Sequence, residues 1–238
     1  MNVRKIDTVG FIVTQNIRAA AIFNTYGIDY YAHGSRTLEE ACIKENVPIV
    51  NLFEELWELG RPDIQYDFAG MDMIQLSTYI LRNHHKFTEK KVTFIKHSLN
   101  RLAGLFGEEH PNILNIKREF DELSLYLTVH MKHEEFIVFP YIHKMVRDHS
   151  HKLNTFQTIE RPISSMKEDH DYEVQVLKKL GRLTNNYQPP KKADYEFVVT
   201  FNAMKELEED LKIHMHLENN LLFPKAMNFA GNIHKHES

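Results

Sequence analysis

One phrase occurs twice in this chain and constrains its fold more than any other feature. Residues 130–140 read HMKHEEFIVFP, and residues 214–224 read HMHLENNLLFP, 84 positions later. Each copy contains a histidine, a glutamate four residues on, an apolar run and Phe-Pro. Residues four apart share one face of a helix, so each copy presents an imidazole and a carboxylate side by side. Core packing has no need of this polar pair in a fixed frame, whereas a metal site does.

One further histidine precedes each copy and extends it into a matching half. His84 lies 46 residues before His130, and His170 lies 44 residues before His214. A chain that climbs one helix and returns along the next regains the same height after about 40 residues including the loop. The pattern therefore predicts one dinuclear metal centre, with six candidate ligands: His84, His130, Glu134, His170, His214 and Glu218.

Long periodic stretches predict an all-α fold, a four-helix bundle preceded by a small helical N-terminal domain. The bundle helices are expected at residues 71–106, 112–148, 161–185 and 194–227. The domains are expected at residues 1–62 and 71–230, with the linker within residues 61–70. In the N-terminal domain we expect three helices: one at residues 14–25, one that begins at Thr37 with a capping box to Glu40, and one that begins at Pro48 and ends near Gly60.

The six candidate ligands lie inside the apolar stripes of the predicted bundle helices. The stripes comprise Met73, Ile80, His84, Phe87 and Phe94; Phe120, Leu123, Leu127, His130, Glu134, Ile137 and Tyr141; Ile163, Met166, His170, Val174 and Leu177; and Met204, Leu207, Leu211, His214, Glu218 and Leu221. Burying a glutamate without a partner is costly, so two buried glutamates indicate bound cations.

The residues around the stripes receive plainer interpretations. His85, His133 and His216 are expected to point off the stripes, as supporting or surface groups. Each Phe-Pro is expected to end or kink its helix. Two interpretations stay open for Asp169, Asp171 and Glu135, which either orient the imidazoles or are ordinary surface charges.

The donor types bear on the identity of the metal. Imidazoles and carboxylates without thiolates suit iron or manganese, whereas a tetrahedral structural zinc site would not need six ligands. If both glutamates bridge two such ions, each ion has four protein ligands, and a bridging oxo or hydroxo group makes five. A single His–Glu pair at this spacing is more often a solvated surface contact. The competing hypothesis is therefore a helical interaction protein that binds no metal.

Composition limits the partners and the cellular location expected of the protein. The net charge of −4 argues against a nucleic-acid partner, and no apolar stretch approaches the length of a membrane span. Cys42 is the single cysteine of the 238 residues, so no intramolecular disulfide can form. The N-terminus has no signal-peptide core of adequate length. We therefore expect a cytoplasmic protein without a membrane partner.

The six-residue pattern with both HMxxE…FP phrases resembles the hemerythrin-like domain of the iron–sulfur cluster repair di-iron proteins, the RIC family. Residues 16–42, NIRAAAIFNTYGIDYYAHGSRTLEEAC, are similar to the short N-terminal (ScdA-type) domain of that family. The resemblance implies that the six residues bind two non-haem iron ions, rather than manganese or zinc, with the glutamates as bridges. It also implies repair of clusters damaged by nitric oxide or oxidative stress, by iron supply or nitric oxide processing, with damaged iron–sulfur proteins as clients.

One segment departs from the family pattern. Relatives commonly carry a Cys-Cys pair followed by glycines, where this chain has Tyr31 and Ala32, then His33 and Gly34. Thiolate chemistry from that segment is therefore absent, and Cys42 is expected to be a small core residue.

Two alternative functions stay open: a hemerythrin-like protein that binds or senses dioxygen or nitric oxide, and a nitric oxide reductase. The N-terminal domain is also a candidate surface for a homodimer.

Overall fold

The computed structural model describes residues 3–60, 67–148, 159–191 and 193–236. Across these ranges the chain is helical and forms no β-strand, and the β-pairing found there is an isolated bridge between Thr8 and Thr37. The predicted all-α fold is confirmed. Among the described helices, none is long and apolar enough to cross a bilayer. Most of the expected linker (residues 61–66) and the loop at 149–158 lie outside the described residues.

The N-terminal module contains four short helices: α1 (Val9–Gln15), α2 (Ala19–Thr25), α3 (Leu38–Glu45) and α4 (Ile49–Glu58). The prediction of one helix at residues 14–25 is wrong. The chain becomes extended at Asn16, with φ −152°, and the Asn16 side chain accepts a hydrogen bond from the Arg18 backbone N–H. The first helix begins earlier than predicted, because the Thr8 side chain caps it by accepting a hydrogen bond from the Phe11 backbone N–H.

The later helices of this module begin where the sequence predicts. The Thr37 side chain accepts from the Glu40 backbone, and the Glu40 side chain accepts from the Thr37 backbone, which is the predicted capping box. Pro48 directly precedes α4. The module encloses a core of its own, with the fully buried side chains Val9, Phe23, Tyr30, Leu38, Leu52 and Leu56.

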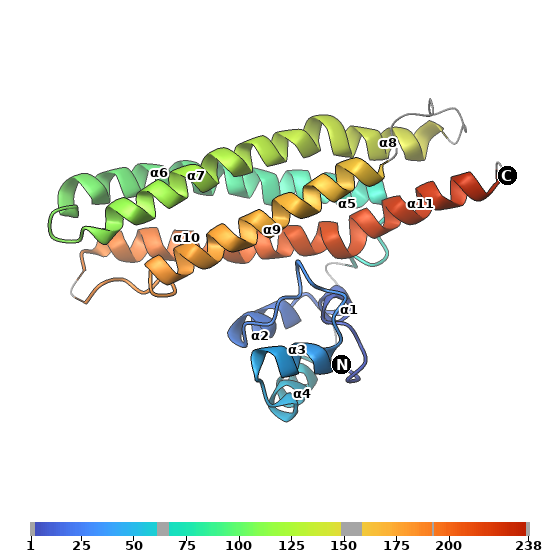
Figure 1. The fold of residues 1–238 in the computed structure, drawn as a ribbon, viewed down its shortest axis with the longest axis horizontal. Helices are drawn as coiled ribbons and strands as arrows, with labels where there is room; N and C mark the ends of the chain where they lie inside the picture. The colour runs from blue at the N-terminus through green and yellow to red at the C-terminus, as the bar shows by residue number, and fades with distance from the viewer. Residues whose placement is uncertain (1–2, 61–66, 149–158, 192, 237–238) are drawn as a thin grey trace. The chain divides into compact units, whose positions relative to one another are not determined.

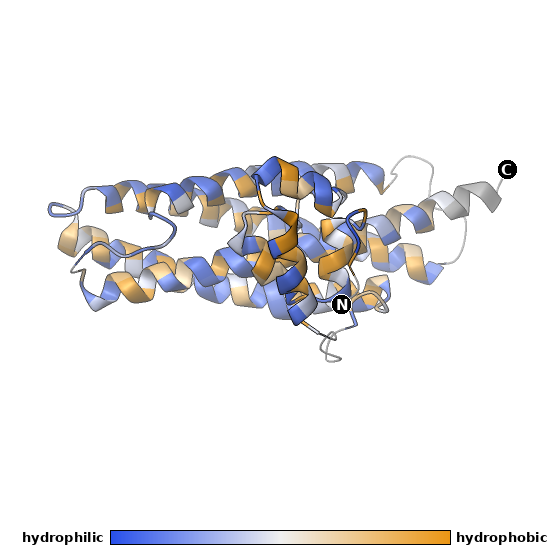
Figure 2. Ribbon diagram, turned by 90° about the horizontal axis from the view of Figure 1, so that it is seen from below, coloured by the Kyte–Doolittle hydropathy of each residue, from blue (hydrophilic) through white to orange (hydrophobic). Residues whose placement is uncertain are grey.

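Contacts along the chain define two compact units. One, Thr78–Lys144 with Arg161–Lys212, contains most of the four long helices: α6 (Lys86–Phe106), α7 (Asn112–His133), α9 (Glu160–Leu183) and α10 (Tyr195–Leu217). These helices run alongside one another as a bundle (Figure 1), and hydrophobic and hydrophilic residues alternate along them (Figure 2). The other unit combines the N-terminal module with Met145–Glu160 and Ile213–Ser238, which includes α11 (Phe223–His236).

Three of the long helical stretches contain a π-helical turn. These turns are η1 (Ile80–His85) between α5 (Met73–Tyr79) and α6, η2 (Glu134–Val138) between α7 and α8 (Phe139–Asp148), and η3 (Glu218–Leu222) between α10 and α11. A π-turn holds more residues than an α-turn, so the residues beyond it are displaced relative to a regular 3.6-residue stripe.

The π-turns explain where the predicted stripes are wrong. Beyond η1, Phe94 is 43% exposed and Phe87 is half-buried, whereas their successors Ile95 and Thr88 are fully buried. Within η2, Ile137 is 52% exposed and Val138 is fully buried; beyond it, Tyr141 is half-buried and Ile142 is fully buried. The stripe has therefore moved by one residue after each of these turns. The predicted stripes of the third and fourth helices are buried throughout.

The expectation that each Phe-Pro ends or kinks its helix is wrong in one respect, because the chain stays helical beyond it. Pro140 is the second residue of α8, and Pro224 is the second residue of α11. A proline inside a regular α-helix lacks one donor, and its ring clashes with the carbonyl four residues back. The wide π-turn that directly precedes each proline relieves that clash.

The thiol of Cys42 should be shielded in the folded protein. Cys42 is 3% exposed, and burial raises the pKa of its thiol. Because the thiolate is the reactive form and the site must open first, alkylation should be at least about a hundredfold slower in the native protein than in urea. Mass spectrometry of iodoacetamide labelling over time measures both rates. Equal rates would contradict a core position for this cysteine.

Candidate metal centre

Glu134 is the focus of a buried cluster in the bundle unit. It opens η2, and its side chain has no exposed surface. His130 Nε2 lies 3.3 Å from Glu134 Oε1, and His85 Nε2 lies 3.3 Å from Glu134 Oε2. His170 on α9 completes the group, because one ligand atom each from His130, Glu134 and His170 lies within 4.8 Å of the others. Three of the predicted ligands therefore meet in this unit.

The other ring nitrogens of His130 and His85 face carboxylates. His130 Nδ1 lies 3.3 Å from Asp169 Oδ2, and His85 Nδ1 lies 3.0 Å from Glu135 Oε1. A carboxylate at Nδ1 fixes the ring orientation and the tautomer, so that Nε2 faces inward. Of the two interpretations left open, Asp169 and Glu135 therefore orient imidazoles. Asp171 is exposed on α9 and fits the surface-charge interpretation.

The prediction that His85 points off the stripe is wrong. His85 has no exposed surface, and its ring also stacks on Phe139 at 5.7 Å between centroids. It is the last residue of η1, and the π-turn brings its side chain to Glu134. The neighbouring His84 is also buried, but its Nδ1 lies 3.0 Å from Asp210 Oδ1 on α10. Helical periodicity alone could not separate these adjacent histidines, because it assumes a regular helix.

The second copy of the phrase repeats the same pair within the other unit. His214 Nε2 lies 3.2 Å from Glu218 Oε1, and the two residues are 2% and 0% exposed. The spacing matches that of His130 and Glu134. His216, expected off the stripe, is fully buried, and burial lowers the pKa of its imidazole to about 4. Both copies of the predicted His–Glu pair are therefore buried as pairs.

Charge around His130 favours a cation. Burial lowers the pKa of His130, but the carboxylates of Glu134, Glu173 and Asp169 outweigh that effect and hold it well above its usual range. The hydrogen bond from His130 in turn lowers the pKa of Asp169. Burial, together with the hydrogen bond to Asp169, raises the pKa of Tyr126. A metal ion at Nε2 would replace the proton that this environment otherwise attracts.

Glu173 is a buried carboxylate that the predicted stripes and ligand pattern do not include. It lies on α9, is 1% exposed, and its Oε1 lies 3.9 Å from His130 Nε2. The signal was its position three residues after His170, which places both side chains on one face of α9. Glu173 adds negative charge next to the cluster on Glu134.

The donor set fits a pair of divalent or trivalent cations. Two donor atoms about 2.1 Å from one ion at an angle near 100° are about 3.2 Å apart. The inward imidazole nitrogens lie 3.2–3.3 Å from the buried glutamate oxygens in both copies of the phrase. The atoms are imidazole nitrogen and carboxylate oxygen, which suit iron or manganese. Each buried carboxylate also needs a positive partner.

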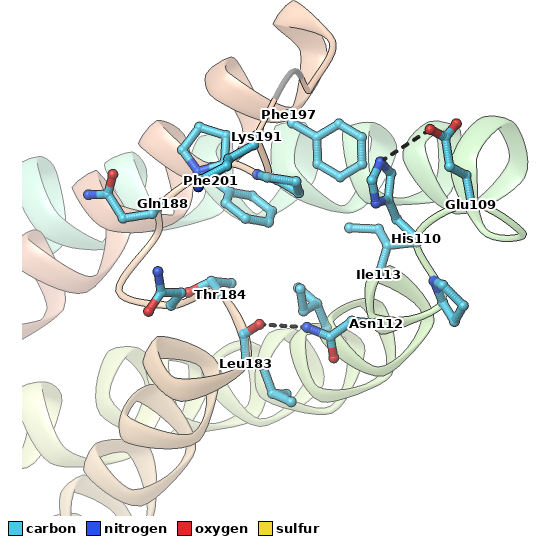
Figure 3. A pocket seen from close by; sticks show the side chains of 15 residues that line it. Glu109, His110, Asn112, Ile113, Leu183, Thr184, Gln188, Lys191, Phe197 and Phe201 are labelled. Carbon is cyan, nitrogen blue, oxygen red and sulfur yellow. Dashed lines mark hydrogen bonds and ion pairs between the residues drawn. The ribbon is translucent and has the colours of Figure 1, made fainter.

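Apart from the cluster on Glu134, a pocket lies where the loops join the helices of the bundle unit (Figure 3). It has a volume of about 460 Å³, and Phe197, Phe201 and Ile113 are among the residues that line it. Asn112 Nδ2 donates a hydrogen bond to the Leu183 backbone oxygen at its edge. Its lining includes one imidazole and one carboxylate, those of His110 and Glu109, which lie 4.0 Å apart. It therefore has fewer metal donors than the cluster on Glu134.

Comparison with known proteins agrees with this chemistry. Residues 76–226 match the model of the hemerythrin HHE cation binding domain, and residues 5–60 match the ScdA N-terminal domain, a domain of unknown function (DUF542). The chain is similar to proteins named iron-sulfur cluster repair protein YtfE from Escherichia coli O8 (strain IAI1), Shigella boydii serotype 4 (strain Sb227) and Escherichia coli (strain K12 / DH10B). Each is 27% identical over 210 residues, which cover 88% of this chain and 91% of the relative.

The carboxylate of Asp169 should contribute to metal affinity through His130. Asp169→Asn keeps the shape but removes the charge at Nδ1 of His130, so metal affinity should fall by about tenfold. Competition with a chelator of known affinity measures the change. Asp171→Asn, two positions along α9 and exposed, is the matched control and should leave affinity as it is. An equal effect of both substitutions would contradict the orienting role.

Proposed function

The chain belongs to the hemerythrin HHE cation-binding family, in its group of iron–sulfur cluster repair proteins, and from this premise we propose that it carries a non-haem di-iron centre that serves cluster repair. The observation that carries this proposal is the pair of fully buried glutamates, each facing inward imidazole nitrogens. The hemerythrin match extends from residue 76 to residue 226 and so includes both copies of the phrase.

The proposed ligands are the six residues of the sequence pattern: His84, His130, Glu134, His170, His214 and Glu218. Glu134 and Glu218 are proposed to bridge the two ions, because a carboxylate offers an oxygen to each of two metals. His85 joins the set as an additional donor, since its Nε2 faces Glu134 and its Nδ1 is held by Glu135. The domain limits, residues 1–62 and 71–230, remain proposals as well.

The protein's own groups have separable tasks at this centre. Asp169, Glu135 and Asp210 hold the outer nitrogens of His130, His85 and His84, which leaves the inner nitrogens for a metal. The apolar side chains around the cluster exclude water from Glu134 and Glu218. Two bound iron ions would supply open coordination positions and redox chemistry that no side chain here provides.

The proposed activity is the supply of iron to iron–sulfur proteins damaged by nitric oxide or oxidants. The similar proteins are named iron-sulfur cluster repair proteins, and the similarity covers 88% of this chain, which itself matches both family domains. Tyr31 and Ala32 stand where the family's cysteine pair is expected, so a reductant or thiol, where one is needed, would come from a partner. A cytoplasmic location, the homodimer and the clients remain predictions.

Reconstitution of a damaged enzyme tests the proposed function. The iron-loaded protein, added to a purified [4Fe–4S] enzyme inactivated with nitric oxide, should restore more activity than an equal amount of ferrous salt. Glu134→Ala should lose this advantage because it removes a proposed bridging ligand. Glu122→Ala, an exposed position on the preceding helix α7, is the matched control and should keep it. Recovery no greater than with free iron would reject the repair function.

Two alternative functions give different readings in the same preparation. A reversible, oxygen-dependent visible absorption band without cluster recovery would favour a protein that binds or senses dioxygen or nitric oxide. Turnover of nitric oxide to nitrous oxide under anaerobic, reducing conditions would favour a nitric oxide reductase. The repair proposal predicts recovery of the client whether or not either signal is present.

A further inference from the structure

The two copies of the repeated phrase differ in what covers them. In the second copy, Asn219 and Asn220 follow Glu218 within η3, and α1 of the N-terminal module contacts η3. In the first copy, the corresponding positions are Glu135 and Phe136, and Phe136 is 71% exposed. The N-terminal module thus covers η3, and the module and η3 belong to the same compact unit.

The two asparagines bind the main chain of the segment 30–34. Asn219 Nδ2 donates to the Tyr31 backbone oxygen over 3.2 Å, and Asn220 Nδ2 donates to the Tyr30 backbone oxygen over 3.1 Å. Asn220 Nδ2 also lies 3.1 Å from His216 Nδ1, and the Tyr30 ring lies against the His216 ring at 5.8 Å between centroids. The module therefore contacts η3 through hydrogen bonds from both asparagines.

The Asn220 side chain fills a slot between two glycines. Gly10 N–H donates to the Gly34 oxygen over 2.8 Å, which joins the two walls of the slot. A Cβ atom at Gly34 would lie 2.1 Å from Asn220 Oδ1 and 2.7 Å from the Tyr30 backbone oxygen. A Cβ atom at Gly10 would lie 2.7 Å from Asn220 Oδ1. The slot therefore has room for this amide only while both walls are glycine.

A π-turn is less stable than an α-turn and persists where other contacts hold it. Asn220 is the third residue of the five in η3, and Glu218 is the first. We propose that segment 30–34 clamps η3 in its π-helical form through Asn220, a positioning residue that directs the Glu218 carboxylate to the metal. The inference rests on the proposed role of Glu218 as a ligand. The segment at the family's cysteine positions thus acts here through backbone carbonyls and Tyr30.

Iron release from the loaded full-length protein tests the clamp. Asn220→Ala removes the amide, and Gly34→Ala places a methyl group in its slot. Each should speed iron loss to a ferrous chelator by about tenfold, the usual effect of removing a group that supports a ligand. Because both act on one contact, the double variant should be no faster than the faster single variant. The visible spectrum of the centre should shift in both single variants.

Phe136→Ala is the matched control, since it changes the corresponding position of η2, which is exposed. It should release iron at the wild-type rate. The link from the clamp to Glu218 is overturned if Asn220→Ala also releases iron at the wild-type rate, and the shared contact is overturned if the two single effects multiply in the double variant.

Hydrogen exchange in the metal-free protein separates the clamp from the proposed function. Asn220→Ala should speed amide exchange in Glu218–Leu222 by about fivefold, the loss of roughly one hydrogen bond, and leave Glu134–Val138 unchanged. This measurement decides the matter even if Gly34→Ala fails to fold. If Asn220→Ala speeds exchange in η3 but releases iron at the wild-type rate, the link to Glu218 is rejected and the clamp on η3 stands. Wild-type protein that binds no iron would overturn the proposed function and this inference together.

Discussion

The rest of the structure depends on one constraint, which is that the side chains of Glu134 and Glu218 are fully buried. An ionised carboxylate in an apolar interior is strongly destabilising unless positive charge and hydrogen-bond donors surround it. Here imidazoles supply the donors, and further carboxylates behind the imidazoles add negative charge rather than balance it. The cluster therefore carries a surplus of negative charge that bound cations would neutralise. This surplus is the physical reason why the proposed centre is metallic.

Much of the fold could be predicted, because helices with apolar stripes and strong end signals determine it locally. The capping box at Thr37 and the stripes of the third and fourth long helices are as expected. The pairing of His130 with Glu134 and of His214 with Glu218 also follows from helical spacing. What could not be predicted are the π-turns, because no regular period anticipates an extra residue. They account for the exposure of Ile137 and for the inward position of His85.

The π-turns and the proposed metal ligands coincide in sequence. η1 contains both His84 and His85, and η2 and η3 each begin at a buried glutamate. A widened turn is a costly local conformation, so its recurrence at three positions of proposed ligands indicates that the local strain is kept where the site needs it. The contacts of Asn220 in the slot between Gly10 and Gly34 give one of these turns support from outside the bundle helices. Sequence spacing gave no sign of this support, because it joins residues far apart in the chain.

The claim that two cations hold the buried carboxylates can be tested most directly by metal analysis and Mössbauer spectroscopy on protein purified from iron-replete cells. The account predicts about two iron ions per chain, coupled as one dinuclear centre with nitrogen and oxygen ligands. It also predicts that replacing Glu134 and Glu218 together abolishes this stoichiometric iron. Folded protein with no stoichiometric metal, or iron content unaffected by that double replacement, would contradict the account.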